Sequence, residues 1–259
     1  MSELSKRVLT ALVLLLLIWG WYFHLPEVWF ESALSLVICL AATCELVLLM
    51  RMPKPVWFML SSLPLWLLFL ERPEVSWLLP AMLVWFAMFI FIPDSEAPSF
   101  SRFFAFAWLF SWLYLFALAI SVTHATDNGR MLVIGACLAV WASDTAAYFV
   151  GRKFGKRKLC PAVSPGKSVE GMFGGLFFGV PVAVICWTSA DLLSWLPAVL
   201  LAMVTVLTGV LGDLSESAVK RMLGVKDSGR WLPGHGGIFD RIDAIIMAVP
   251  VTWLLWSML

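Results

Sequence analysis

Asp144 is the first residue in this sequence whose position suggests chemistry. It lies inside an apolar run, seven residues before Gly151, or roughly 10 Å from that glycine along a helix. A charged side chain near the middle of a membrane costs on the order of 3 kcal/mol or more, so it usually faces a polar cavity or a partner. Tyr148 lies four residues further on and shares its helix face. A structural pairing with a neighbouring helix remains the alternative to a functional role.

Two further carboxylate pairs lie on either side of a polar segment. Asp213 and Glu216 lie at the end of a long apolar run, and Asp240 and Asp243 repeat the three-residue spacing at the start of the last one. The helix dipole favours acids at a helix start, but it does not explain why acids from three helix ends are expected on one membrane face. Carboxylate oxygens without a His or Cys cluster suit Mg²⁺, bound together with substrate phosphates.

Cations and glycines surround these acids. The Ser164–Ser168 and His235–Gly237 stretches can present backbone N–H groups to a phosphate, with a lysine as a point charge. His235 is either a phosphate donor or acid–base group, or a loop histidine that bonds a neighbour. A P-loop is not expected, because Pro161 stands where its first glycine should be. The cations near the acids are Lys167, Lys220, Arg221, Lys226, Arg230 and Arg241.

The composition belongs to a membrane protein. Of 259 residues, 61% are hydrophobic and only 14% are charged, whereas a soluble domain carries about a quarter charged residues. The net charge of +1 gives no basic field for nucleic acid, so no nucleic-acid partner is expected. The five cysteines have no CxxC spacing, which predicts buried thiols rather than a metal site or disulfides.

The apolar runs predict an all-α, polytopic membrane bundle of about nine helices, with the first span uncleaved. With the N-terminus inside, sixteen of the eighteen Lys and Arg residues fall in inner segments, and only Arg72 and Arg130 fall in outer loops. This bias predicts that the N-terminus and the two long polar loops lie on the inner side of the membrane. The runs lie near 8–25, 27–50, 56–70 (a borderline length), 75–93, 104–123, 131–150, 172–189, 191–212 and 239–258.

Charge distribution divides the expected bundle into two regions. Residues 1–130 carry about five spans, and residues 131–259 form the catalytic membrane region. The latter holds two cytoplasmic loops, 151–171 and 213–238, which contain most of the charge. The bilayer itself is therefore an expected partner, and the candidate site is expected to face the cytoplasm.

The second loop resembles the phosphatidate cytidylyltransferase (CDP-diacylglycerol synthase) family. The resemblance covers about residues 140–245 and includes Asp144 with Ala147, Tyr148 and Gly151, and Ser164-Pro-x-Lys-Ser-x-Glu-Gly171. Its most specific part is Ser217-x-Val-Lys-Arg221, four residues, Lys226-Asp-x-Gly229, two residues, Leu232-Pro-x-His-Gly-Gly-Ile-x-Asp240-Arg-Ile-Asp243.

The resemblance implies transfer of CMP from CTP to phosphatidate, giving CDP-diacylglycerol and pyrophosphate in phospholipid biosynthesis. It further implies a homodimer in a bacterial-type inner membrane, dependent on Mg²⁺ and with room for a second metal ion. Metal ligands would be Asp213, Asp240 and Asp144, and the catalytic residues Asp213, Asp240, Lys220 and Lys167. Substrate would be bound by Ser164, Lys167, Ser168, Ser217, Lys220, Arg221, Lys226, His235, Gly236, Gly237, Arg241 and Asp243.

Two rival functions remain open at this stage. A transporter or ion-binding protein could use Asp144 and the inner acids as a cation site, but it would spread its charges along several spans near the midplane. A different CTP-using enzyme, such as a prenyl-lipid cytidylyltransferase, is compatible with the spacing. The sequence also leaves open whether Glu45, about five residues from the inner end of its span, has an accessory role.

Overall fold

The computed structural model describes residues 16–17, 19–52, 54–91, 99–126, 128–229 and 236–259. The chain forms two compact units, and each is described by itself. The first contains Met1–Ala117 and Val225–Arg241, and the second contains Leu118–Gly224 and Ile242–Leu259. The second unit thus begins at Leu118, whereas the expected catalytic region begins at residue 131. The described residues 225–229 and 236–241 group with the N-terminal helices.

Helices dominate both units, as expected for a helical membrane protein. Five helices among the described residues are long and apolar enough to cross a membrane: Val28–Leu49, Phe100–His124, Gly129–Phe154, Val169–Ser189 and Trp195–Met222. Three apolar helices are shorter: Pro55–Glu71, Val75–Phe91 and Ile245–Trp256. The all-helical membrane class is therefore confirmed, and the total of nine spans stays a prediction.

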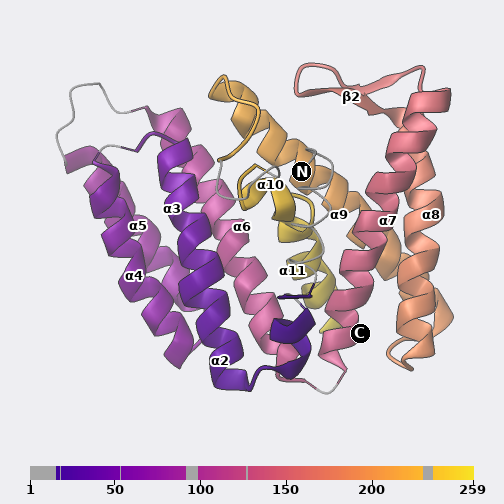
Figure 1. Ribbon diagram of the computed structural model, residues 1–259, viewed down its shortest axis with the longest axis horizontal. Coiled ribbons are helices and arrows are strands. Elements are labelled where there is room, and N and C mark those ends of the chain that lie inside the picture. The colour runs from indigo at the N-terminus through magenta and orange to yellow at the C-terminus, as the bar shows by residue number, and fades with distance from the viewer. Residues whose placement is uncertain (1–15, 18, 53, 92–98, 127, 230–235) are drawn as a thin grey trace, which may run out of the picture. The chain divides into compact units, whose positions relative to one another are not determined.

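The first unit is a bundle of helices whose aromatic residues interlock. Trp85 packs edge-on against Phe110, with ring centroids 4.5 Å apart. The indole of Trp66 donates a hydrogen bond across the bundle to the Thr43 hydroxyl at 3.1 Å. The elements are α2 (Glu27–Ser32), the π-helical η1 (Ala33–Cys39), α3 (Leu40–Leu49), α4 (Pro55–Glu71), η2 (Val75–Trp77), α5 (Leu78–Phe91) and the first part of α6 (Phe100–His124), as Figure 1 shows.

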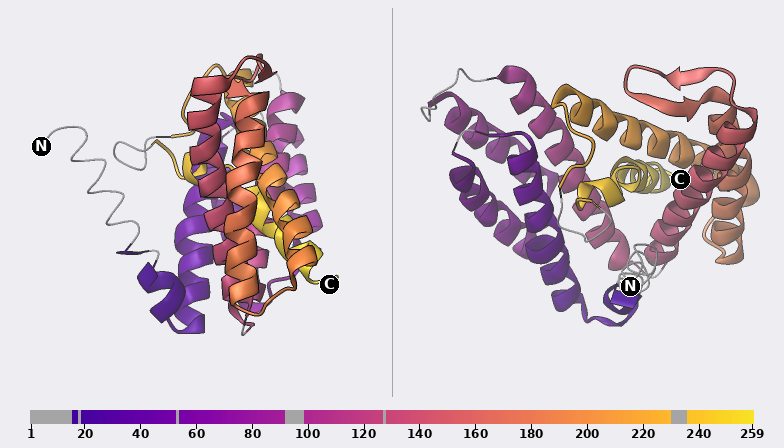
Figure 2. Two further views of the ribbon diagram at one scale, coloured as in Figure 1. Left: turned by 90° about the vertical axis from the view of Figure 1, so that its right-hand side faces the viewer. Right: turned by 45° about the horizontal axis from the view of Figure 1, so that its top comes forward.

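The second unit is built around α7 (Gly129–Phe154) and α8 (Val169–Ser189), which run side by side (Figure 2). A two-stranded antiparallel hairpin, β1 (Lys158–Cys160) and β2 (Ser164–Ser168), connects them. Helices α9 (Trp195–Met222) and α11 (Ile245–Trp256) complete the unit. The short α10 (Phe239–Ile242) leads from the first unit into the second.

Small residues allow α7 and α8 to approach closely. Every fourth residue along the facing surface of α8 is a glycine, and a side chain there would collide with α7. A Cβ at Gly171 would lie 2.8 Å from the carbonyl oxygen of Ala147, and one at Gly179 would lie 2.7 Å from that of Ala139. Small residues at four-residue spacing are a common way for membrane helices to pack. The close packing fixes α7, and therefore Asp144, against α8.

Three boundaries differ from the expectations. Helix α9 continues through Met222, so the first part of the expected 213–238 loop is helical. The 151–171 segment contains the last turn of α7 and the hairpin, rather than loop alone. The last apolar run is interrupted at Asp243 and Ala244, between α10 and α11. All three changes fall in or beside polar segments, where an apolar pattern does not reveal whether a helix continues.

Candidate functional site

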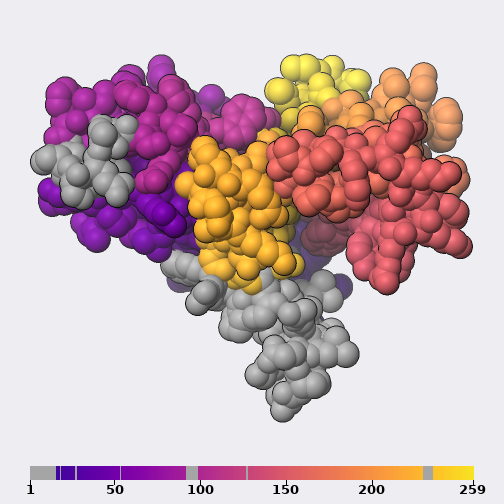
Figure 3. Space-filling model, turned by 90° about the horizontal axis from the view of Figure 1, so that it is seen from above, coloured from indigo at the N-terminus to yellow at the C-terminus, as the bar shows by residue number. Residues whose placement is uncertain are grey.

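The hairpin presents Lys167 beside the carboxyl-terminal part of α9. Glu170, in the first turn of α8, holds the start of the hairpin. Its carboxylate accepts hydrogen bonds from the backbone N–H groups of Lys156 at 3.0 Å and Arg157 at 3.1 Å. Arg221 on α9 donates from Nε to the carbonyl oxygen of Val163 in the hairpin turn at 3.3 Å. The space-filling view shows the hairpin against this end of α9 (Figure 3).

Lys167 and Asp213 form an ion pair at the centre of the candidate site. The Lys167 ammonium nitrogen lies 2.5 Å from Oδ2 of Asp213, and each side chain is 25% exposed. The Ser217 hydroxyl, one helical turn further along α9, donates to the other carboxylate oxygen, Oδ1, at 3.3 Å. Because the pair retains access to solvent, an incoming cation can compete with the ammonium for Asp213.

Gly212 allows Asp243 to lie close to Asp213 on α9. A Cβ on Gly212 would collide with the carbonyl oxygen of Asp243, so only glycine allows the turn between α10 and α11 to lie this close to α9. Burial raises the pKa of Asp243 to about 7, and the negative charge of Asp213 adds to the effect. The turn therefore delivers a second carboxylate beside Asp213.

Asp144 completes this acidic group from α7. Its carboxylate interacts electrostatically with Lys167 and Asp213, and also with Asp243. Helix α7 ends at Phe154 rather than near Gly151, so Asp144 lies ten residues, or about 15 Å, from the helix end. It lies deeper along its helix than expected, and the charges of Lys167 and Asp213 act on it.

Lys220 forms a second ion pair on α9, one turn beyond the first. Its ammonium nitrogen lies 2.5 Å from Oε2 of Glu216, and both side chains are largely buried. Lys220 also acts electrostatically on Asp243. The second unit therefore brings together Asp144, Lys167, Asp213, Glu216, Ser217, Lys220, Arg221 and Asp243, of which all but Glu216 were expected site residues.

The expected residues of the 225–241 segment belong to the first unit. Asp240 accepts backbone N–H bonds from Gly237 at 2.8 Å and from Ser228 at 3.0 Å. Gly236 has a φ of +84°, which favours glycine, and a Cβ there would meet the Asp240 carboxylate. Asp240 therefore organises the backbone around it, in addition to any role as a ligand.

Four other expected residues have less informative surroundings. Ser168 accepts the Gly171 backbone N–H at 3.1 Å and so caps the start of α8. Ser164 pairs with Cys160 in the hairpin through backbone atoms. Lys226 and Arg241 lie in the first unit, and Arg241 directly follows Asp240. His235 lies outside the residues that the structure describes, as does Arg230.

Glu45 is the residue whose environment the sequence indicated least. It lies on α3, is 1% exposed and accepts hydrogen bonds from the Ser228 hydroxyl and from two backbone N–H groups. The only sequence signal was a carboxylate within an apolar span. Ser228 gave no signal at all, because it occupies a variable position of the motif.

The donor set suits a hard divalent cation. Among the described residues no group of three or more His, Cys, Asp or Glu side chains is already arranged around a metal position. The Lys167 ammonium places a positive charge beside the Asp213 carboxylate. Asp144 and Asp243 interact electrostatically with Asp213, and carboxylate oxygens are the donors typical of Mg²⁺ and Ca²⁺ sites.

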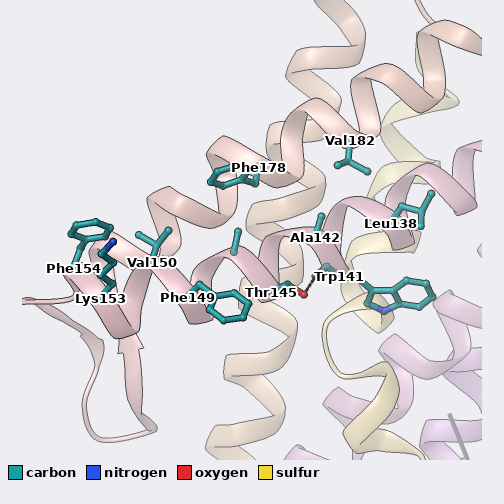
Figure 4. Close-up of a pocket in the computed structure, with 11 residues that line it drawn as sticks. Leu138, Trp141, Ala142, Thr145, Phe149, Val150, Lys153, Phe154, Phe178 and Val182 are labelled. Carbon is teal, nitrogen blue, oxygen red and sulfur yellow. Dashed lines mark hydrogen bonds between the residues drawn. The ribbon is translucent and has the colours of Figure 1, made fainter. Parts of the chain in front are cut away.

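An open apolar groove of about 780 Å³ lies on α7 and α8, and the carboxylates of the site do not line it. Figure 4 shows Phe149, Phe178 and Val182 along it, with Lys153 and Phe154 at one end. The Thr145 hydroxyl is bonded to the Trp141 carbonyl oxygen, which leaves a mainly hydrocarbon surface. Such a surface is compatible with lipid contact but carries none of the proposed chemistry.

These features define a helical membrane protein with a charged site made of paired acids and cations. Comparison with known proteins identifies the class more closely. The sequence profile of the Cytidylyltransferase family matches residues 5–259. The chain belongs to this family, which suggests a requirement for a divalent metal.

Several curated relatives carry the name phosphatidate cytidylyltransferase. The chain is 47% identical over 133 residues to one from Haemophilus influenzae, covering 49% of this chain and 46% of the relative. It is 41% identical over 140 residues to one from Bacillus subtilis, covering 54% and 52%. One from Staphylococcus aureus is 45% identical over 129 residues, covering 48% of each. The matches thus span about half the length of these relatives.

Proposed function

We propose that this protein transfers a cytidylyl group from CTP to phosphatidate and so makes CDP-diacylglycerol and pyrophosphate. The observation that carries the proposal is the pairing of Lys167 with Asp213 inside a wider group of carboxylates. Membership of the Cytidylyltransferase family and the names of the relatives supply the substrate pair. The transporter alternative is less well supported, because most charged residues of α7 and α9 lie in the carboxyl-terminal halves of these helices rather than spread along them.

In the proposed reaction a phosphatidate oxygen forms a bond to the α-phosphorus of CTP. The bond from that phosphorus to the oxygen bridging the β-phosphate breaks, and pyrophosphate leaves with the electron pair. A phosphate monoester has a second pKa near 6, so the nucleophile is largely ionised without a dedicated base. The main barrier is therefore the approach of two anions, which cations and aligned donors lower.

Each group of residues has a distinct proposed task. Lys167, Lys220, Arg221, Lys226 and Arg241 bind and orient phosphates, and Ser164, Ser168, Ser217, His235, Gly236, Gly237 and Asp243 complete the substrate contacts. Asp213, Asp240 and Asp144 would hold Mg²⁺, with room for a second ion. The metal, when bound, neutralises phosphate charge and polarises the phosphorus centre. Lys167, released from Asp213, then becomes available to a phosphate oxygen.

The cellular setting is also part of the proposal. We place the protein in a bacterial inner membrane with the site on the cytoplasmic side, because the sixteen-to-two charge bias follows the positive-inside rule. CTP and Mg²⁺ reach the site from the cytoplasm and phosphatidate from the bilayer. A homodimer is proposed from the family resemblance alone.

The decisive experiment is a reaction with purified protein, phosphatidate, radiolabelled CTP and Mg²⁺. We expect CDP-diacylglycerol and pyrophosphate in equal amounts. Replacing phosphatidate by a prenyl phosphate tests the rival cytidylyltransferase, and a prenyl-linked product in place of CDP-diacylglycerol would overturn the substrate assignment. Absence of any nucleotide-linked lipid from correctly inserted protein would contradict the enzyme proposal.

A further inference from the structure

Glu45 is a carboxylate that the reaction chemistry does not use, yet both of its oxygens accept hydrogen bonds from the protein. Its Oε1 accepts from the Ser228 hydroxyl at 2.5 Å and from the Phe239 backbone N–H at 3.1 Å. Its Oε2 accepts from the Ile238 backbone N–H at 2.7 Å. Three donors from the 225–241 segment therefore meet a single side chain on α3, about 190 residues earlier in the sequence.

The packing around Glu45 leaves no space for another group. Glu45 is 1% exposed, Phe239 is fully buried and Ser228 is 6% exposed. A Cβ at Gly237 would collide with both the Glu45 carboxylate and the Ser228 hydroxyl, so glycine is needed at that position. A buried carboxylate with its oxygens occupied by protein donors is poorly placed to bind a metal or a substrate itself.

Ser228 connects Glu45 to Asp240. Its hydroxyl donates to Glu45, while its backbone N–H donates to the Asp240 carboxylate at 3.0 Å. The Gly237 N–H donates to Asp240 as well, and the next two N–H groups along the chain donate to Glu45. The two carboxylates thus hold the same two short backbone stretches, near residue 228 and at 237–239.

We propose that Glu45 is a positioning residue that fixes the backbone carrying Asp240, through Ser228 and residues 237–239, and so sets the orientation of the Asp240 carboxylate. The inference rests on the proposed function, in which Asp240 would hold the divalent metal. Partners that orient a metal ligand change metal affinity or activity by about 10- to 100-fold when they are removed. A buried acid in an apolar helix is consistent with such a role, because it is retained only where it has a specific partner.

Glu45→Gln is the most informative variant, because it keeps the size of the side chain and removes one acceptor. In either orientation of the amide, its NH₂ faces a backbone N–H of Ile238 or Phe239, so one of these bonds is lost. We expect faster hydrogen exchange of the amides of residues 236–241. We also expect the Mg²⁺ concentration for half-maximal activity to rise by about 10-fold or more.

Ser62→Ala provides a matched control for a second variant, Ser228→Ala. Both serines are buried in the first unit, but the Ser62 hydroxyl donates within its own helix, to the Met59 carbonyl oxygen at 2.7 Å. Ser228→Ala should raise the Mg²⁺ requirement, and Ser62→Ala should leave it unchanged. Adding Ser228→Ala to Glu45→Gln should have less effect than the two single changes predict, because both remove the same link.

The Mg²⁺ midpoint separates positioning from a general loss of folded protein, which would lower the maximal rate and leave the midpoint unchanged. Unchanged amide exchange at residues 236–241 in Glu45→Gln would overturn the proposal, and so would an unchanged midpoint. The exchange measurement needs no turnover. If the wild-type protein makes no CDP-lipid, the proposed function fails, while wild-type exchange rates in Glu45→Gln would refute the inference on Glu45 separately.

Discussion

The two units use their acids in different ways. In the second unit Asp213 and Glu216 pair with the lysine ammonium groups of Lys167 and Lys220. In the first unit Glu45 and Asp240 accept hydrogen bonds from backbone N–H groups. A mobile ammonium group can be replaced by a metal ion or can turn to a phosphate, whereas a backbone N–H can do neither without rearranging the chain. The second unit is therefore suited to exchange of ligands, and the first to holding a conformation.

The largest effect is expected from removing the exchangeable acid. Asp213→Asn should lower CDP-diacylglycerol formation by on the order of 10²- to 10³-fold, because the amide is a poor metal ligand and no longer pairs with Lys167. The initial rate of CDP-diacylglycerol formation at saturating CTP measures this loss of activity. Asp191→Asn, in the exposed turn between α8 and α9, is the matched control and should retain activity. Comparable rates for the two variants would refute the metal assignment.

A smaller effect is expected from the partner of that acid. Lys167→Met should raise the KM for CTP by about 10-fold, because a phosphate contact is lost while the carboxylates remain. Steady-state kinetics at fixed phosphatidate measures the change. Lys158→Met removes an exposed lysine from the neighbouring strand and should leave the KM near that of the wild type. Equal KM values for the two variants would mean that Lys167 serves only to balance Asp213.

Asp243 should make the stability of the folded protein depend on pH. Its pKa is raised on folding to about 7, so the folded protein binds this proton more tightly than the unfolded chain, and stability is lost as pH rises from about 4 to 7. Without Mg²⁺, Asp243→Asn should remove this loss, a difference on the order of a few kcal/mol. Thermal unfolding at pH 5 and pH 8 measures it. The same change of Tm with pH in both proteins would contradict the assignment.

The smallest effect is expected at Ser168, where a cap and a substrate contact predict different results. Loss of the hydrogen bond to the Gly171 N–H should destabilise the protein by about 1 kcal/mol in Ser168→Ala. If capping is its only role, the KM for CTP will stay unchanged while Tm falls. A raised KM at unchanged Tm would instead support the proposed substrate contact.

Much of the candidate site was predictable because the chain's polarity is so uneven. Asp144 stands out as a carboxylate inside an apolar run, and Asp213 stands out at the end of another. Within the second unit, the structure brings both residues together with Lys167 and Asp243. The roles of these residues stay predictions, because proximity alone does not identify a ligand.

Other features could not be read from the pattern. The extension of α9 through Met222 places Ser217, Lys220 and Arg221 on a helix, although the polar stretch was expected to be a loop. Apolar periodicity marks the part of a helix that faces lipid, and it does not continue where a helix emerges among charged partners. Ser228 was missed because a serine between polar residues is unremarkable until its distant partner is known.

The sequence by itself determined the environment and the chemical class of the protein. Long apolar runs require helices that satisfy their own backbone in lipid, and acids and cations gathered near their ends predict a phosphate and metal site. Only the tertiary structure decided which acid performs which task. Glu45 and Asp213 are both carboxylates at the polar end of an apolar helix, yet one faces backbone N–H groups and the other faces a lysine. That difference depends on contacts between distant segments, which local residue patterns do not specify.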